Sequence, residues 1–244
     1  MEGLSTTRRI LGRWALVALT ATAIWLPGCS GFKGTTAASF LRNIKESPDP
    51  NLRYVSYAKL ASPQCYDNEQ QKEDAVRLLV AKLEEGKEPV ATRAMICRTL
   101  GELHNRAARG VIANAVSDNE GIVRAQACRA LGKVGTAEDA TVLTRVMTVD
   151  TLEDCRIAAI EGLGELKSDD PRIMGMLIGG MDHDDPAIRH ASYQSLRAIT
   201  RKDLGIDPAE WRKALEPQLA AKAPSDTGTI KASNPAPASA PAPR

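Results

Sequence analysis

The chain is poor in aromatic residues: Phe, Trp and Tyr together make up 4% of its 244 residues. β-Sandwiches and barrels usually need more aromatic side chains in their cores, whereas helical repeats rich in Ala, Leu, Arg and Glu do not. The sequence also lacks a Cys-x-x-Cys pair, a glycine-rich phosphate loop, a serine nucleophile elbow and a His-Glu-x-x-His motif. The usual sequence signs of a zinc site, a nucleotide site and a hydrolase are therefore missing.

Charge of one sign is also scarce. The formal net charge is +2, and the residues before Cys29 account for it, so the rest of the chain is neutral. A nucleic-acid-binding protein would be expected to carry a basic face, so no nucleic-acid partner is expected. The three histidines, His104, His183 and His190, are scattered and do not form a metal-binding pattern. We expect neither a metal nor a cofactor.

The N-terminus has the pattern of an export signal. Arg8, Arg9 and Arg13 precede an apolar stretch over residues 14–26, which is shorter than the ~20 residues of a membrane-spanning helix. The stretch ends in Leu26-Pro27-Gly28-Cys29, which resembles the lipobox of bacterial lipoproteins. The resemblance implies a signal peptide over residues 1–28 and a fatty-acylated (palmitate-type) Cys29 that anchors the chain to a membrane. An ordinary secretory signal with a chance cysteine is the alternative.

The expected location is therefore the cell envelope. Ser30 follows the lipidated position, and a residue other than Asp there is compatible with sorting to the outer membrane, facing the periplasm, in a Gram-negative host.

An internal repeat is the strongest pattern in the sequence. Five arginines are each followed seven residues later by leucine, and the spacing between consecutive arginines is 40, 31, 32 and 33 residues. Residues three, four and seven positions after each arginine fall on one helix face and are mostly small or apolar. The arginine–leucine pairs are Arg53/Leu60, Arg93/Leu100, Arg124/Leu131, Arg156/Leu163 and Arg189/Leu196.

A second helix is expected after each of these helices. Its signature is an apolar pair four residues apart, namely Leu79/Leu83, Ile112/Val116, Leu143/Met147 and Leu177/Met181. Each predicted hairpin exposes an apolar face that it cannot bury alone, and stacking on neighbouring hairpins buries it. This predicts an array of helical hairpins.

Three segments make the resemblance specific. Ile122-Val123-Arg124-Ala125, Cys155-Arg156-Ile157-Ala158 and Asp185-Pro186-Ala187-Ile188-Arg189, each with its downstream leucine, resemble the short HEAT repeat of bacterial proteins, the variety also found in phycobilin lyases. The resemblance implies an all-α fold: a right-handed α-solenoid of about five HEAT-type hairpins. The first unit departs from the pattern, because a longer connection follows Leu60, and we interpret it as an N-terminal cap.

The predicted organisation has four parts: a signal peptide over residues 1–28, a flexible tether over 29–39, the solenoid over 40–217 and a disordered Ala/Pro-rich tail over 218–244. Asp207 and Pro208 are expected to begin the last helix, and Trp211 and Leu215 to pack it onto the array.

The five arginines have two interpretations. They could bind a polyanion, or each could pair with an acidic residue of an inter-repeat turn, such as Asp49, Glu120 or Asp185, and we favour the second. Of the cysteines after Cys29, Cys97 and Cys128 occupy equivalent sites in adjacent repeats, too far apart for a disulfide, and are expected to be buried thiols. A Cys65–Cys97 pairing stays an open alternative.

The sequence favours a binding module over an enzyme. We expect a membrane-anchored scaffold with an unknown protein partner and no catalysis. The HEAT resemblance implies that the second helices line the concave face, where Lys82, Asn114 and Arg145 lie between the buried pairs and are the candidate partner-binding residues. The alternatives are an enzyme or enzyme subunit of the HEAT-like lyase type, and a purely structural spacer.

Overall fold

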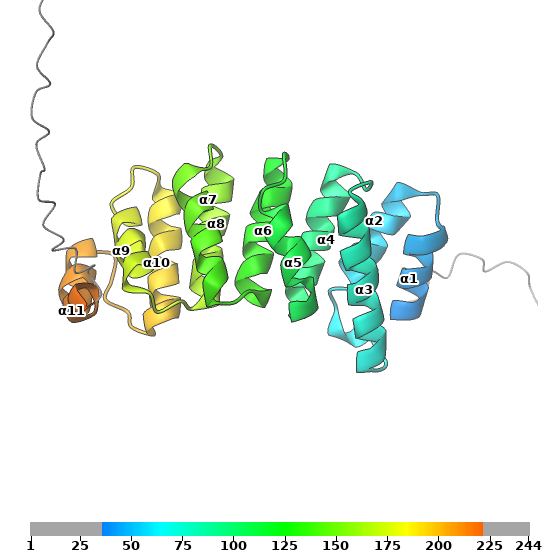
Figure 1. The fold of residues 1–244 in the computed structure, drawn as a ribbon, viewed down its shortest axis with the longest axis horizontal. Helices are drawn as coiled ribbons and strands as arrows, with labels where there is room; N and C mark the ends of the chain where they lie inside the picture. The colour runs from blue at the N-terminus through cyan, green and yellow to red at the C-terminus, as the bar shows by residue number, and fades with distance from the viewer. Residues whose placement is uncertain (1–35, 222–244) are drawn as a thin grey trace, which may run out of the picture. The chain divides into compact units, whose positions relative to one another are not determined.

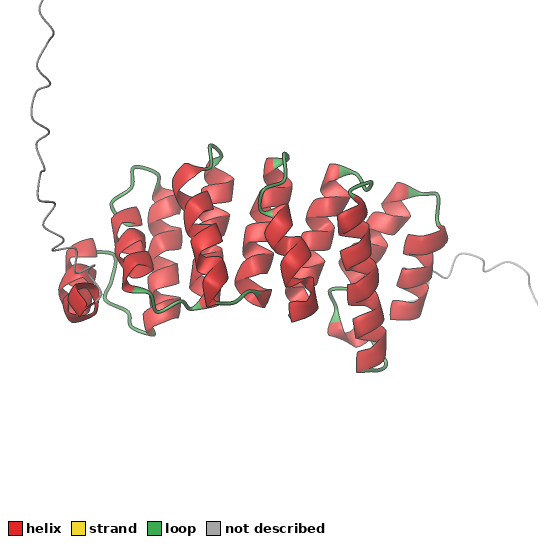
Figure 2. Ribbon diagram, in the orientation of Figure 1, coloured by secondary structure: helices red, strands yellow, loops and turns green. Residues whose placement is uncertain are grey.

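The computed structural model describes residues 36–221, and within this range the chain is entirely helical, without a strand (Figure 2). Three short 3-10 turns, η1 (Pro63–Cys65), η2 (Arg106–Ala108) and η3 (Ala137–Asp139), join some of the helices. The helices are α1 (Ala37–Glu46), α2 (Pro50–Lys59), α3 (Glu69–Glu85), α4 (Val90–Glu102), α5 (Arg109–Ala115), α6 (Gly121–Val134), α7 (Ala140–Val149), α8 (Glu153–Leu166), α9 (Pro171–Gly180), α10 (Pro186–Thr200) and α11 (Pro208–Ala221).

The helices form a row of antiparallel hairpins in chain order (Figure 1). In the units predicted from the sequence, α2/α3, α4/α5, α6/α7, α8/α9 and α10/α11, the arginine-bearing helix is the first helix. The observed contacts pair the helices differently: α1 packs on α2, α3 on α4, α5 on α6, α7 on α8 and α9 on α10, and α11 packs on α9. The predicted α-solenoid of about five hairpins is confirmed, but its hairpins are shifted by one helix from the predicted units, for which we keep the names first and second helix. The turns that lead from one predicted unit to the next, which we call inter-repeat turns, lie along one edge of the row, the upper edge in Figure 1. The apolar pairs predicted for the second helices are buried, apart from Met147, which is half-buried.

Side-chain caps set several helix starts. Asp49, Asp185 and Asp207 each accept a hydrogen bond from the backbone N–H two residues later, and a proline follows each of them. A carboxylate cap satisfies an N–H that has no partner within the helix, and proline suits the first helical position. The sequence prediction for Asp207 and Pro208 is therefore confirmed. At the other end of α3, Gly86 takes a φ of 65° and turns the chain toward α4.

The first helices of the predicted units, α4, α6, α8 and α10, are packed against one another through small residues. A Cβ added to Gly132 would lie 2.6 Å from the Cα of Gly162, and one added to Gly101 would lie 2.8 Å from the Cα of Ala130. By contrast, the second helices α5, α7 and α9 make little backbone contact with one another. A stack bends toward its more closely packed row, so the first helices α4, α6, α8 and α10 line the inner side of the bend. The expectation that α3, α5 and α7 line the concave face is therefore wrong, because the helices of each contacting hairpin come in the opposite order to that of the predicted units.

The array begins earlier and ends later than the sequence predicted. α1 starts at Ala37, inside the predicted tether of residues 29–39; Thr36 caps it, and Phe40 and Ile44 are buried in it. α11 continues to Ala221, beyond residue 217. Trp211 and Leu215 of α11 are fully buried, and the Trp211 indole N–H donates to the Gly205 carbonyl at 2.7 Å, so their predicted packing is confirmed.

Cys65, Cys97, Cys128 and Cys155 are buried free thiols. Burial raises the pKa of Cys97 and of Cys128 to about 12, so both stay protonated at neutral pH. The expectation for Cys97 and Cys128 holds, and Cys65 is not joined to Cys97. In residues 36–221 no helix is long and apolar enough to cross a bilayer. The predicted signal peptide, Cys29 and most of the predicted tail lie outside the described residues.

Candidate interaction surface

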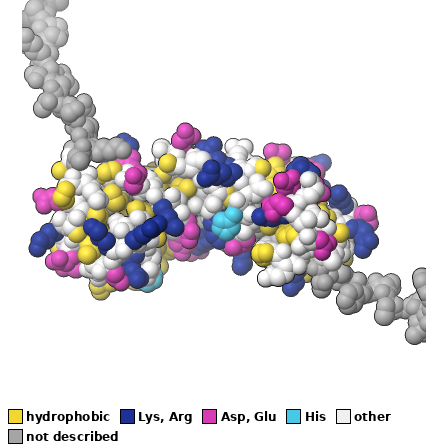
Figure 3. Space-filling view, turned by 90° about the horizontal axis from the view of Figure 1, so that it is seen from below, with side chains coloured by type: hydrophobic (Ala, Val, Ile, Leu, Met, Phe, Trp, Pro, Cys, Tyr) yellow, Lys and Arg dark blue, Asp and Glu magenta, His cyan; other side chains and the backbone are white. Residues whose placement is uncertain are grey.

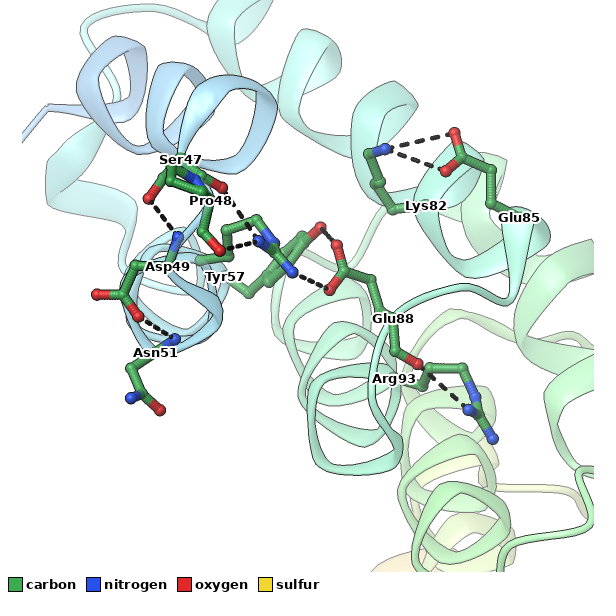
Figure 4. A network of polar contacts seen from close by, with 10 residues as sticks. Ser47, Pro48, Asp49, Asn51, Tyr57, Lys82, Glu85, Glu88 and Arg93 are labelled. Atoms are coloured by element: carbon green, nitrogen blue, oxygen red, sulfur yellow. Dashed lines mark hydrogen bonds and ion pairs between the residues drawn. The ribbon is translucent and has the colours of Figure 1, made fainter.

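The five repeat arginines, Arg53, Arg93, Arg124, Arg156 and Arg189, form an arginine ladder along the inter-repeat edge. At its N-terminal end, Arg53 donates to the carbonyls of Ser47 and Pro48 at 3.0 and 3.2 Å, in the turn before its own helix. It also pairs with Glu88 of the next inter-repeat turn at 3.5 Å (Figure 4). The Tyr57 hydroxyl donates to the same carboxylate at 3.0 Å. One guanidinium thus joins two successive turns.

The next two arginines repeat this geometry. Arg93 donates to the Glu88 carbonyl at 3.3 Å and to the Asp118 carboxylate at 3.1 Å. Arg124 donates to the carbonyls of Asp118 and Asn119, and it makes a two-pronged contact with Asp150 at 2.8 and 3.0 Å. Planar two-pronged contacts of this kind are the strong form of the arginine–carboxylate pair.

These contacts show that the ladder is structural where it is complete. The side chains of Arg124 and Asp150 are 17% and 8% exposed, and hydrogen bonds from Arg124 hold the pKa of Asp150 below its ordinary range. The guanidinium groups of Arg53, Arg93 and Arg124 are paired within the protein, so they do not form a polyanion-binding site. The preferred sequence interpretation is confirmed, but the named acids were wrong. Asp49 and Asp185 cap their own helices, Glu120 makes no side-chain cap bond, and the paired carboxylates belong to the following turn.

The ladder is incomplete toward the C-terminus. Arg156 pairs only with Glu153, on its own helix, at 3.4 Å, and its Nε is buried without a hydrogen-bond partner among residues 36–221. Asp182 pairs with Arg212 of α11 instead. Arg189 keeps the two carbonyl contacts, to His183 and Asp184, and no downstream carboxylate is paired with it in the part of the chain that the structure describes.

The structure places the three predicted partner-binding residues on the second helices, on the outer side of the bend, and does not bring them together. Lys82 of α3 is half-buried and pairs with Glu85 at 3.1 Å (Figure 4). Asn114 of α5 is exposed. Arg145 of α7 is exposed and has no ion pair among the described residues. Arg145 lines a hollow in the surface.

That hollow is a groove between α5 and α7 of about 300 Å³. It lies between second helices that stand apart; Val116 and Val146 in it are buried, Val142 is half-buried and Val149 is exposed. We call it the valine groove after Val116, Val142, Val146 and Val149, and Arg124, Arg145 and Asp150 contribute its polar atoms. Pockets for protein side chains commonly combine an apolar floor with a few oriented polar groups.

Exposed apolar side chains continue from this groove onto the inter-repeat edge. Ile122, Val149 and Leu152 are 56%, 65% and 47% exposed, and we call them the apolar rim. Leu152 contacts Gly121, next to Ile122, and Val149 belongs to both the rim and the groove. The sequence prediction missed this surface. Its only signal was that Leu152 stands at the helix-capping position where α2 and α10 have aspartates.

The first-helix row is a second candidate surface, but its charges are largely paired. Lys133 pairs with Glu102 at 2.8 Å, and Arg129 pairs with Glu161 at 2.6 Å. On the lower edge of the row in Figure 1, Lys/Arg and Asp/Glu side chains are interspersed (Figure 3). A partner there would have to displace existing ion pairs, which makes this row a weaker candidate than the valine groove.

Two further features bear on chemistry. A groove of about 540 Å³ lies between α9, α10 and α11, lined by Met174, Ile199 and Leu215 together with Asp169 and Lys202. Over residues 36–221, no three His, Cys, Asp or Glu side chains are placed to hold a metal ion together.

Comparison with known proteins agrees with the fold. Residues 76–164 match the family model of HEAT repeats, which is less than half of the chain. Among solved structures, the chain is similar to one in the complex of CpcE and CpcF of phycocyanin lyase from Nostoc sp. PCC7120, with a TM-score of 0.56 and 20% sequence identity. The similarity covers 77% of this chain and 71% of that one. No protein of curated function matches the sequence. The chain is thus a HEAT-like repeat protein by fold.

Proposed function

We propose that this protein is a membrane-anchored scaffold that binds another protein and has no catalytic activity of its own. The observation that carries the proposal is the apolar rim, a group of exposed apolar side chains held on a helical array beside the valine groove. Contiguous exposed apolar surface with a polar border is typical of protein–protein contact sites.

The rigidity of the array supports a binding role. The ladder contacts fix the turn that carries Val149 and Leu152, because Asp150 accepts hydrogen bonds both from Arg124 and from the Leu152 backbone N–H at 3.0 Å. A surface that is already ordered loses little conformational entropy on binding. The solved structure with the similar fold is itself a complex, which is compatible with assembly through this kind of array.

The anchoring part of the proposal rests on the sequence. The predicted export signal and the lipobox-like Leu26-Pro27-Gly28-Cys29 support a lipid on Cys29 and a location in the cell envelope, facing the periplasm from the outer membrane in a Gram-negative host. A tethered array would concentrate its partner at the membrane surface.

Site-specific photo-crosslinking in cells tests the proposal. A photoreactive residue at Arg145 is expected to capture a discrete partner, while the same residue at Arg106, exposed in η2 on the opposite edge, is expected to capture none. Loss of the partner in a Cys29→Ala strain would support the anchored scaffold. Equal capture in both strains would make the anchor unnecessary, and no capture at Arg145 would remove the binding surface.

The lyase-type alternative makes a different prediction for the same strains. It expects purified full-length protein to carry a bound small molecule or pigment, detectable by absorbance and mass spectrometry. The groove beside α11 is the largest of the described cavities that could hold one. The spacer alternative expects no crosslink at any surface position, and a defect only when repeats are removed.

A further inference from the structure

We infer that the valine groove and the apolar rim bind a basic, amphipathic segment of another protein. This inference rests on the proposed binding function and specifies the chemistry of the partner. It follows from three features of one surface: where its apolar side chains lie, how firmly they are held, and which charges surround them.

The apolar side chains are concentrated in the middle of the array. Three of the six large apolar side chains that stand exposed within residues 36–221 are Ile122, Val149 and Leu152, which belong to α6, the end of α7 and the turn before α8. Val149 continues into the groove with Val116, Val142 and Val146. The apolar rim and the adjoining valine groove could each take one apolar side chain from the same face of a bound segment.

This apolar surface is held in place from beneath. The turn between α7 and α8 is fixed by the Arg124–Asp150 pair and by the Asp150–Leu152 backbone hydrogen bond. The Cys155 thiol donates to the Gly121 carbonyl at 3.2 Å and ties the start of α8 to the start of α6. Val149 and Leu152 are thus held in exposed positions. Apolar groups kept exposed by a rigid framework are ready to bind.

The surrounding charges determine the sign of the partner. Glu120, Glu153 and Asp154 border the rim and are exposed. Of these, only Glu153 is ion-paired among the described residues, to Arg156. Asp118 and Asp150 are nearby, but their charges are offset by Arg93 and Arg124. The edge around Ile122 and Leu152 is therefore acidic, and lysine or arginine flanking the apolar residues of a partner would complement it.

The same charges favour a protein over a membrane surface. The cytoplasmic and bacterial membranes that attract proteins electrostatically are anionic, and such a surface would repel Glu120 and Asp154. Two cations line the groove: Arg124 is already paired with Asp150, whereas Arg145 can pair with a carboxylate of the bound segment and fix its direction. The bound segment is expected to lie across α7, with its basic end toward α6 and α8.

Two synthetic peptides test the inference. Both carry the same leucine face at helical spacing; one has lysines on its polar face and the other has glutamates. Both carry a fluorophore and a photoreactive group. Binding is measured by fluorescence anisotropy with the full chain bearing Cys29→Ala, so that no lipid interferes. We expect the lysine peptide to bind at least ten-fold more tightly than the glutamate peptide and to crosslink within residues 116–154.

Variants of the surface identify the contacts. Val149→Ser with Leu152→Ser is expected to weaken lysine-peptide binding by about ten-fold or more, since each leaves a leucine anchor without its contact. Glu120→Gln with Asp154→Asn is expected to reduce the preference for lysine over glutamate. Ile206→Ser is the matched control, because Ile206 is 80% exposed in the connection before α11, far from the rim in sequence. All variants are checked for an unchanged circular dichroism spectrum.

Several outcomes would overturn the inference. Equal binding of the two peptides, crosslinks outside residues 116–154, or an equal loss with Ile206→Ser would each do so. So would binding to vesicles containing one quarter phosphatidylglycerol that depends on Val149 and Leu152. If a cellular partner still crosslinks at Arg145 while the peptides fail, the scaffold proposal stands and the basic amphipathic partner is wrong.

Discussion

The two halves of the array are held together in different ways. From α2 to α6, each ladder arginine joins the turn before its own helix to a carboxylate of the next turn, as Arg93 joins Glu88 to Asp118. From α8 to α11 this connection is missing. The Ser195 hydroxyl donates to the Ile160 carbonyl at 2.8 Å and joins α10 to α8, while buried Trp211 and the exposed Arg212–Asp182 pair hold α11. The same repeat therefore gives a continuous polar framework in one half and apolar end packing in the other.

This difference bears on function. The proposed binding surface is at α5–α8, where the framework is complete, and a rigid support keeps its apolar side chains exposed. In a repeat protein, stability is close to a sum of unit and interface terms, so the two halves can be perturbed separately. The predictions below exploit that separation, beginning with the largest effect.

Gly132→Ala should be the most damaging single change, because a Cβ there would lie 2.6 Å from the Gly162 Cα and 2.7 Å from the Gly162 carbonyl oxygen. Backbone atoms cannot move aside as a side chain can, so α6 and α8 must separate. We expect the free energy of unfolding to fall by about 2–3 kcal/mol in urea melts. Gly110→Ala is the matched control, since a Cβ at Gly110 meets nothing within 4 Å, and it should stabilise the protein by about 0.5 kcal/mol.

Arg124→Met compared with Arg156→Met tests whether the ladder matters where it is complete. Arg124→Met leaves the nearly buried Asp150 carboxylate and two carbonyls without their donor, and should lower the free energy of unfolding by about 2 kcal/mol. Arg156→Met removes only a contact with exposed Glu153 and should lower it by less than about 1 kcal/mol. Equal losses in urea melts would show that the two halves do not differ as the contacts suggest.

Much of this framework was predictable from sequence, and the limits are instructive. The arginine–leucine period identifies the hairpins because burial recurs at helical spacing in every unit. It does not identify α1, because this helix lacks the arginine–leucine pair that marks the other units. It also identifies an arginine but not its carboxylate: Asp49 and Glu88 are both acids of inter-repeat turns, and only the path of the folded turn decides which one caps and which one pairs.

The candidate surface was harder to predict for a related reason. Arg145 was identified from its place between buried residues, which periodicity determines. The valine groove depends on how far α5 lies from α7, and that distance follows from the close packing of the first helices through Gly132 and Gly162. Curvature of this kind is a property of the stacked array and is not encoded within one unit.

The contribution of the arginine ladder to the free energy of unfolding should depend on pH through Asp150. Hydrogen bonds from Arg124 hold the pKa of Asp150 below its ordinary value in the folded chain. A carboxyl of this kind contributes stability that is present above its unfolded pKa of about 3.9 and is lost as the pH falls through the lower folded pKa. We therefore expect Asp150→Asn to be less stable at neutral pH and to lose less further stability on acidification below about pH 4. Parallel stability–pH curves for the two proteins would contradict this linkage.

The smallest effect is expected at Arg212, and it probes why the ladder stops. The Arg212 and Asp182 side chains are each 53% exposed, so Arg212→Ala should lower the free energy of unfolding by less than about 1 kcal/mol. Asp182 follows Arg156 at the same separation of 26 residues as Asp150 follows Arg124. Removing Arg212 releases Asp182, and we expect Arg156 to take it up as the missing ladder contact.

A double-mutant cycle measures that exchange. Arg156→Met should cost more in the Arg212→Ala background than in the natural chain, because only there does Arg156 hold a carboxylate in the next turn. Additivity of the two changes within about 0.3 kcal/mol would show that the ladder ends for another reason, such as the position of α9 rather than competition from α11. A coupling above that value would mean that the terminal helix interrupts the framework by taking its carboxylate, so that end packing and ladder continuity are alternatives for Asp182.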